Sequence, residues 1–139
     1  MVISFVSLGK PQTKGGLNAK YHPASGKTAL WYPPQVARAA KVIADEAAKT
    51  MKEKGYPVIE GRCVCRLKFF LKPTKTGRLI GDLDKLARLV FDALTGVVWA
   101  DDGWVQTLTA SKEPVETNYA GIEMGLERTE VYVSLAGLA

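Results

Sequence analysis

Four aspartates in two close pairs are the residues of this chain best suited to chemistry. Asp82 and Asp84 are two positions apart, and Asp101 and Asp102 are adjacent. Residues two apart in an extended segment project to the same side, so the first two carboxylates can face one point. Clustered carboxylates repel one another, and a hard divalent cation such as Mg²⁺ relieves that repulsion. Mg²⁺ also activates water for attack on a phosphodiester. The pattern therefore favours metal-dependent phosphodiester hydrolysis, provided that the fold brings the pairs together.

Each pair also has an ordinary structural interpretation, which the sequence leaves open. Asp is a preferred residue at a helix N-terminus, and this would explain one of the first two aspartates. Asp-Asp followed by Gly103 is typical of a turn. Arg88 lies four residues after Asp84, where it could neutralise a developing oxyanion or simply form an ion pair with a neighbouring Asp.

The spacing of apolar residues predicts the elements that must position these pairs. A helix over residues 83–94 would follow the first pair and would be roughly 18 Å long. A short strand over 97–99 would return about 10 Å toward the helix start, so either the helix must start late or the loop must help to close the remaining gap. The apolar arc of this helix is wide, which indicates either deep burial or a surface shared with a second subunit. A homodimer follows from the second option.

The rest of the chain alternates strand and helix signals. Loops are expected over 9–27 and 72–81, an irregular segment over 114–126, and a long helix over 35–54 after a Pro-Pro pair. Further strands are expected over 2–7, 58–71, 105–111 and 129–135. This order predicts an α+β fold: one domain over residues 1–139, with a mixed β-sheet and two main helices.

Composition narrows the function classes. The chain has 139 residues, 47% of them hydrophobic, and a formal net charge of +5. No apolar run approaches a membrane span, and the first base, Lys10, follows the apolar start instead of preceding it, so we expect a cytoplasmic protein. Cys63 and Cys65 would share one strand face as buried thiols, because a zinc site would need more ligands than the single histidine, His22, could add.

Basic residues gather in the two predicted loops, which permits a nucleic-acid partner but is equally typical of a solvated loop. If the partner is DNA, the residues expected to contact its phosphates are Lys10, Lys14, Lys72, Lys75, Arg78 and Lys85.

The segment 81–105 resembles the RusA family of Holliday junction resolvases. The matching features are Asp82-Leu83-Asp84, a base at Arg88, Phe-Asp-Ala-Leu ending at Leu94, and an aromatic before Asp-Asp. The early Gly-Lys-Pro and the later base Lys112 also resemble the family. The similarity spans nearly the whole chain but is specific only from 81 to 105.

The resemblance implies a Mg²⁺-dependent homodimer that makes paired nicks across a four-way DNA junction. It implies Asp82, Asp84 and Asp102 as metal ligands, with Asp101 beside them, and a catalytic Arg88. Two residues depart from the family pattern: Lys85 replaces Asn, and Arg88 replaces Lys, which exchanges a point charge for a planar fork. The opening loop also lacks the Arg-rich run of many relatives.

Two other functions remain in view. Asp-Leu-Asp also resembles the nucleophile motif of haloacid-dehalogenase-like phosphatases, although that motif belongs on the first strand of a larger domain. A non-catalytic basic DNA-binding module would use the aspartates only as caps and turns.

Overall fold

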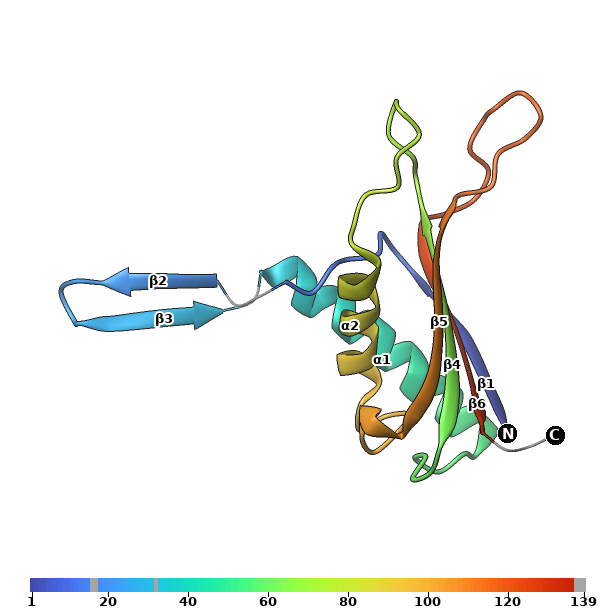
Figure 1. The fold of residues 1–139 in the computed structure, drawn as a ribbon, viewed down its shortest axis with the longest axis horizontal. Helices are drawn as coiled ribbons and strands as arrows, with labels where there is room; N and C mark the ends of the chain where they lie inside the picture. The colour runs from blue at the N-terminus through green and yellow to red at the C-terminus, as the bar shows by residue number, and fades with distance from the viewer. Residues whose placement is uncertain (16–17, 32, 137–139) are drawn as a thin grey trace.

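The computed structural model describes residues 1–15, 18–31 and 33–136 (Figure 1). These residues form six strands, two α-helices and one short 3₁₀ turn. In chain order the elements are β1 (Val2–Leu8), β2 (Asn18–His22), β3 (Lys27–Trp31), α1 (Pro34–Lys54), β4 (Cys63–Leu71), α2 (Leu83–Leu94), η1 (Asp102–Trp104), β5 (Val105–Pro114) and β6 (Arg128–Leu135). None of the helices described is long and apolar enough to cross a membrane.

Four strands form one mixed sheet in the order β1-β6-β4-β5, which confirms the predicted α+β class. β6 pairs antiparallel with both β1 and β4, whereas β4 and β5 run parallel. Alternate residues of β1 and β4 are buried, as a sheet with one covered face requires. Both helices lie on that face (Figure 1), and the core between them and the sheet includes Leu67, Leu89 and Trp99.

The observed limits of both helices lie close to those predicted from the sequence. α1 begins at Pro34, one residue before the expected start, where a missing N–H costs nothing. It ends at Gly55, whose φ of +66° is a left-handed conformation that glycine adopts without strain. α2 spans the predicted residues 83–94. Its wide apolar arc is buried within the chain itself, through Leu86, Leu89, Val90 and Leu94 among others, so that arc gives no surface to a second subunit.

The expected loop over 9–27 is wrong in its second half. β2 and β3 form an antiparallel hairpin whose partners run from Asn18 opposite Trp31 to His22 opposite Lys27. Figure 1 shows this hairpin projecting away from the rest of the fold. Its strand pattern was not visible in the sequence, because β3 buries none of its residues and its apolar residues Ala29, Leu30 and Trp31 stand in a row without alternation. The residues 16–17 of the expected loop lie outside the part that the structure describes.

Two strand predictions also need correction. The strand expected over 58–71 begins only at Cys63, and Ile59 makes just an isolated bridge to Trp99. Residues 97–99 form a tight turn that Gly96 starts by donating its N–H to the Trp99 carbonyl at 2.7 Å. The chain therefore does not return toward the start of α2. The other strands run up to three residues past their expected limits, and 115–127 is largely irregular as predicted.

Candidate active site

A sharp turn aims Asp82 at the start of α2. Gly81 has a φ of +118°, where a side chain would be strained, and a Cβ there would also press on Leu86 and Thr13 at 3.4 Å. Asp82 occupies the N-cap position, and its carbonyl accepts the N–H of Leu86 at 2.9 Å. Its carboxylate makes no capping hydrogen bond and is 70% exposed, with the ammonium of Lys85 at 3.6 Å. The helix therefore does not need this carboxylate as a cap.

Asp84 and Arg88 lie one turn apart on the exposed face of α2. Among the residues that the structure describes, neither makes an ion pair or a side-chain hydrogen bond. Asp92, the next residue along that face, pairs with the ammonium of Lys14. The simple ion pair considered for Arg88 is thus not formed, and both Asp84 and Arg88 are free to meet a ligand.

The second acidic pair begins a 3₁₀ turn in front of β5. The carboxylate of Asp101 accepts the N–H of Gly103 at 2.8 Å, which is the turn interaction that the sequence suggested. Asp102 is exposed and opens the turn. Just before it, the buried Trp99 packs edge-on against Phe91 with ring centroids 5.2 Å apart and donates its indole N–H to Thr95. This pair therefore rests on a fixed, apolar support.

The two acidic pairs lie at opposite ends of α2. The helix has 12 residues, which is roughly 18 Å of rise. A second measure agrees, because the ammonium of Lys112 donates to the carbonyls of Leu79 and Gly81, next to Asp82, at 2.8 and 2.9 Å. From Lys112 back to Val105, where β5 begins beside Asp102, the strand covers roughly 23 Å.

The connection between the parallel strands explains this separation. β4 ends near the start of α2, the helix runs back along the sheet, and β5 then starts at the far end. The expectation that a strand over 97–99 runs back toward the start of the helix is wrong for this reason. Carboxylate oxygens suit Mg²⁺, but the described residues bring no three Asp, Glu, His or Cys side chains together. One chain thus offers an aspartate pair at each end.

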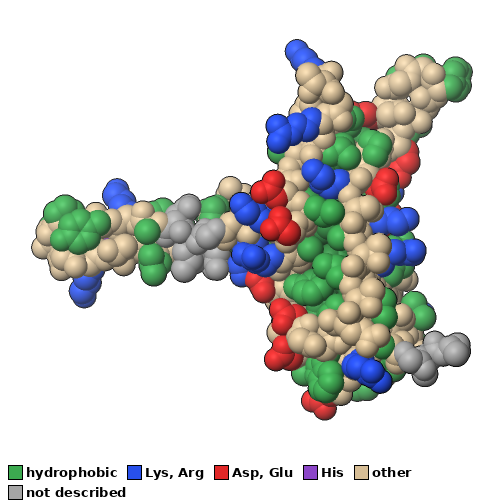
Figure 2. All heavy atoms as spheres, in the orientation of Figure 1, with side chains coloured by type: hydrophobic (Ala, Val, Ile, Leu, Met, Phe, Trp, Pro, Cys, Tyr) green, Lys and Arg blue, Asp and Glu red, His purple; other side chains and the backbone are tan. Residues whose placement is uncertain are grey.

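The basic residues expected to bind DNA gather near the Asp82 end. Figure 2 shows Lys and Arg side chains on the loop that leads into α2 and beside the acidic side chains along the helix. Lys75 and Arg78 stand on that loop, which the Thr74 hydroxyl orders by accepting the backbone N–H of Arg78. Lys72 lies 3.7 Å from the carboxylate of Glu123. Lys14 is held against α2, since its N–H also donates to the Lys85 carbonyl.

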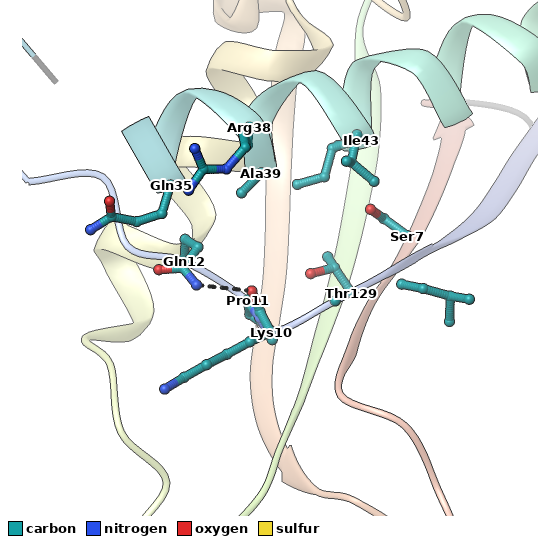
Figure 3. Close-up of a pocket in the computed structure, with 12 residues that line it drawn as sticks. Ser7, Lys10, Pro11, Gln12, Gln35, Arg38, Ala39, Ile43 and Thr129 are labelled. Carbon is teal, nitrogen blue, oxygen red and sulfur yellow. Dashed lines mark hydrogen bonds between the residues drawn. The ribbon is translucent and has the colours of Figure 1, made fainter. Parts of the chain in front are cut away.

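Lys10 lies elsewhere, at a pocket of about 240 Å³ between the chain after β1 and the start of α1. Figure 3 shows Arg38 above Gln12 there, and the Lys10 ammonium extending away from the helix. None of the four aspartates lines this pocket. Sequence analysis did not predict this pocket, and it assigned Arg38 to a solvated face of α1, where the structure leaves it exposed.

Sequence analysis also missed what Lys112 does. The family resemblance pointed to this residue, but its two bonds to loop carbonyls depend on the parallel pairing of β5 with β4. Lys112 fixes the loop that carries Asp82 to the end of β5. It is thus a positioning residue for the first acidic pair.

The cysteines behave as the sequence predicts. Both Cys63 and Cys65 are buried free thiols at the start of β4. Burial, together with the neighbouring Cys63, raises the pKa of the Cys65 thiol to about 12. Neither thiol is suited to nucleophilic chemistry.

The arrangement described so far has exposed aspartates at both ends of a helix, basic loops at one end and a mixed sheet beneath. The model of the family named endodeoxyribonuclease RusA matches residues 9–127 of the chain. This chain belongs to the RusA family. The match spans both acidic pairs, both predicted basic loops and all elements from β2 to β5. No curated protein matches the chain. Membership of an endodeoxyribonuclease family makes DNA hydrolysis the relevant chemistry and argues against a small-ester phosphatase.

Proposed function

We propose that this chain is a Mg²⁺-dependent endonuclease that resolves four-way DNA junctions by paired symmetric nicks, as one domain over residues 1–139 and as a homodimer. The observation that supports this most is the state of the aspartates in a RusA-family chain. The Asp82 carboxylate makes no capping hydrogen bond and has only an exposed ion pair with Lys85, and Asp84 forms no ion pair among the described residues. Exposed carboxylates with so few local interactions are available for a cation.

In this proposal Asp82 and Asp84 hold Mg²⁺ together with Asp102, and Asp101 lies beside Asp102. Because the two pairs lie at opposite ends of α2, the homodimer must bring pairs of its two subunits together. When bound, Mg²⁺ supplies an activated water and offsets charge on the phosphate under attack. The chain's own residues do the remainder. Asp101 keeps the turn that presents Asp102, and the Gly81 turn presents Asp82. Arg88, on the same helix face as Asp84, neutralises charge that develops on the phosphate oxygens.

The basic residues position the DNA and read no sequence. Lys72, Lys75 and Arg78 belong to the segment that leads to Asp82, and Lys85 lies 3.6 Å from its carboxylate; their charges suit the two backbones that meet at a junction. Lys14 reaches DNA only by exchanging its ion pair with Asp92 for a phosphate. Lys10 is placed to hold a more distant part of a DNA arm.

The experiment is cleavage of a labelled four-way junction, with a plain duplex of the same sequence beside it. We expect two symmetric nicks in the junction with Mg²⁺, none in EDTA, and an uncut duplex. Tight junction binding with no cutting in Mg²⁺ or Mn²⁺ would instead support the non-catalytic DNA-binding module. In that module the aspartates would serve only as helix caps and turn residues, as Asp101 does in its turn.

A further inference from the structure

The chain between β5 and β6 forms a projection whose tip is held by its own hydrogen bonds, and we call residues 116–126 the finger. Gly121, with a φ of +79°, donates its N–H to the Asn118 carbonyl at 2.9 Å and so closes a turn. The Asn118 side chain accepts the N–H groups of Ala120 and Ile122 at 2.9 and 3.0 Å. The Asn118 N–H donates to the Ile122 carbonyl at 2.9 Å. The tip is therefore formed before any partner arrives.

Arg128 fixes the base of the finger. Its guanidinium donates to both carboxylate oxygens of Glu116 and to the Glu130 carboxylate, and it lies 3.7 Å from the centroid of the Phe70 ring. A Cβ at Gly125 would collide with the Glu116 carboxylate, so glycine there leaves room for the contact. The hydrogen bonds from Arg128 lower the pKa of Glu116 to about 2, and the pair therefore stays ionised at neutral pH.

The fixed finger presents apolar side chains to solvent. Tyr119 is fully exposed, and Ile122, Met124 and Leu126 are each at least 60% exposed. Residues 118–122, which form the tip, include no charged side chain. Figure 2 shows hydrophobic side chains gathered at the end of this projection. Apolar side chains exposed together indicate a binding surface, and a tip that is already ordered loses little entropy when it binds.

The finger stands beside the basic loop that leads to the first acidic pair. Both extend from the same end of the sheet in Figure 1. At their bases, Val115 donates its N–H to the Leu71 carbonyl at 3.0 Å. Lys72 donates its backbone N–H to the Glu127 carboxylate at 3.1 Å, and its ammonium lies 3.7 Å from the Glu123 carboxylate. DNA held by the basic loop would therefore lie close to the finger.

The chemistry of the tip suits the face of a base better than a phosphate. The three carboxylates of this segment already have partners: Glu116 pairs with Arg128, and Glu123 and Glu127 contact Lys72. The neutral tip offers an aromatic ring, on which any base can stack. Inside a duplex, neighbouring base pairs cover both faces of each base. Where the arms of a junction meet, each stack ends, so a base face becomes available there.

We infer that the finger recognises the branch point of the DNA, with Tyr119 stacked on a base face exposed where the arms meet and Ile122 beside it. Lys and Arg contacts to phosphate hold branched and linear DNA alike, so they cannot supply this selectivity. Tyr119 is thus a residue that determines specificity for branched over linear DNA. The inference rests on the proposed function in taking a four-way junction as substrate, and it adds the source of selectivity.

Binding without cleavage tests the role of Tyr119. In EDTA, Tyr119→Ala should weaken binding of a labelled four-way junction roughly five- to 150-fold, the usual loss for one base-stacking ring. Binding of a plain duplex should not change. Tyr119→Phe should keep the wild-type ratio of the two affinities. The control is Val58→Ala, an exposed apolar position beside Ile59, which bridges Trp99 at the other end of α2. It should leave both affinities unchanged.

Photocrosslinking tests where the ring lies. A junction carries 5-iodouracil either at the branch point or in the middle of one arm, and irradiation joins this base to an aromatic ring stacked on it. We expect a crosslink at the branch point with the wild type and with Tyr119→Phe, none with Tyr119→Ala, and none in the arm. Asn118→Ala, which removes the acceptor that orders the tip, should lower the yield. Because both side chains are exposed or local to the tip, melting temperatures should stay near wild type.

The outcomes separate this inference from the proposed function. If the wild type cuts junctions while Tyr119→Ala keeps the affinity ratio and no branch-point crosslink forms, the finger inference is overturned and the proposed function stands. Equal losses on junction and duplex would also overturn it, as would a Tyr119→Ala variant that changes only the sedimentation of the protein. A wild type that never cuts, but loses branch selectivity and the crosslink with Tyr119→Ala, would overturn the proposed function and support the finger.

Discussion

The two ends of α2 carry the same kind of side chain on different supports. At the first end, Asp82 follows the Gly81 turn, its carboxylate makes no capping hydrogen bond, and the ammonium groups of Lys85 and Lys112 lie nearby. At the second end, Asp101 is tied into a 3₁₀ turn above the buried Trp99. The first end, where the exposed Asp82 carboxylate lies beside cations, has the character of a ligand-binding site, and we call it the receiving end. The second is a rigid arm, a fixed turn that holds the Asp102 carboxylate at the surface. The difference shows that the two acidic pairs have unlike surroundings, so we expect them to contribute differently to the proposed metal site.

The largest effect should come from neutralising the presented carboxylate. Asp102→Asn keeps the size of the side chain and removes a ligand charge, so we expect single-turnover cutting to fall by at least about a thousandfold. Asp101→Asn should cost far less, because an amide oxygen can still accept the Gly103 N–H. Equal losses in the two variants would show that Asp101 contributes as much to cleavage as Asp102 does, and does not only support the turn. Cleavage of a labelled junction in excess enzyme measures both.

A smaller effect is expected from loosening the receiving end. Lys112→Met removes both donors that hold the Leu79 and Gly81 carbonyls, so the loop carrying Asp82 can shift. We expect cutting to fall by about ten- to a hundredfold, as misplacement by about 1 Å commonly costs. Lys112→Arg should restore part of the loss. Junction affinity and melting temperature, measured on the same samples, should change little; a collapse of the fold would show that Lys112 is only structural.

Sequence patterns predicted the structural features that depend on local periodicity. The limits of α2, the buried Cys pair and the start of α1 follow from spacing, glycine and proline. The parallel pairing of β4 with β5 could not be read in this way, because strand direction depends on contacts distant in the chain. That pairing decides where Asp102 lies, and so the expected return of the chain toward the start of the helix is wrong.

The hairpin and Lys112 were missed for related reasons. β3 shows no buried side of its own, so composition alone suggested a loop. The importance of Lys112 lies in two carbonyls some thirty residues earlier, a contact with no signature in sequence. Residue types thus indicated the chemistry, and the crossover topology determined its geometry.

The basic loop before α2 should affect binding more than chemistry. Neutralising Lys72, Lys75 and Arg78 together should flatten the dependence of log affinity on log salt by about 2–3 units if each meets a phosphate. The single-turnover rate at saturating protein should stay near wild type. An unchanged slope would show that DNA approaches α2 from another side. Titrations of a labelled junction at several salt concentrations give the slope.

The smallest effect concerns the support beneath the second end. Cys63 lies at the start of β4 in register with Val105, and burial raises the pKa of its thiol. A raised pKa leaves little thiolate at pH 8, so native protein should react with a thiol reagent far more slowly than unfolded protein. The contrast should persist in the Asp102→Asn variant. Rapid reaction of native protein would mean that this end opens and is not a rigid arm.

The central claim is that the aspartates serve cleavage and not folding, and Asp82→Asn tests it most directly. An amide at this position can still stand at the helix N-terminus, so the fold should survive. We predict that junction binding persists or tightens, while single-turnover cutting in Mg²⁺ falls by several orders of magnitude. Asp92→Asn, which loses only its pair with Lys14 and no proposed ligand, should retain most activity. Cutting by Asp82→Asn within about tenfold of wild type would contradict the metal-site assignment.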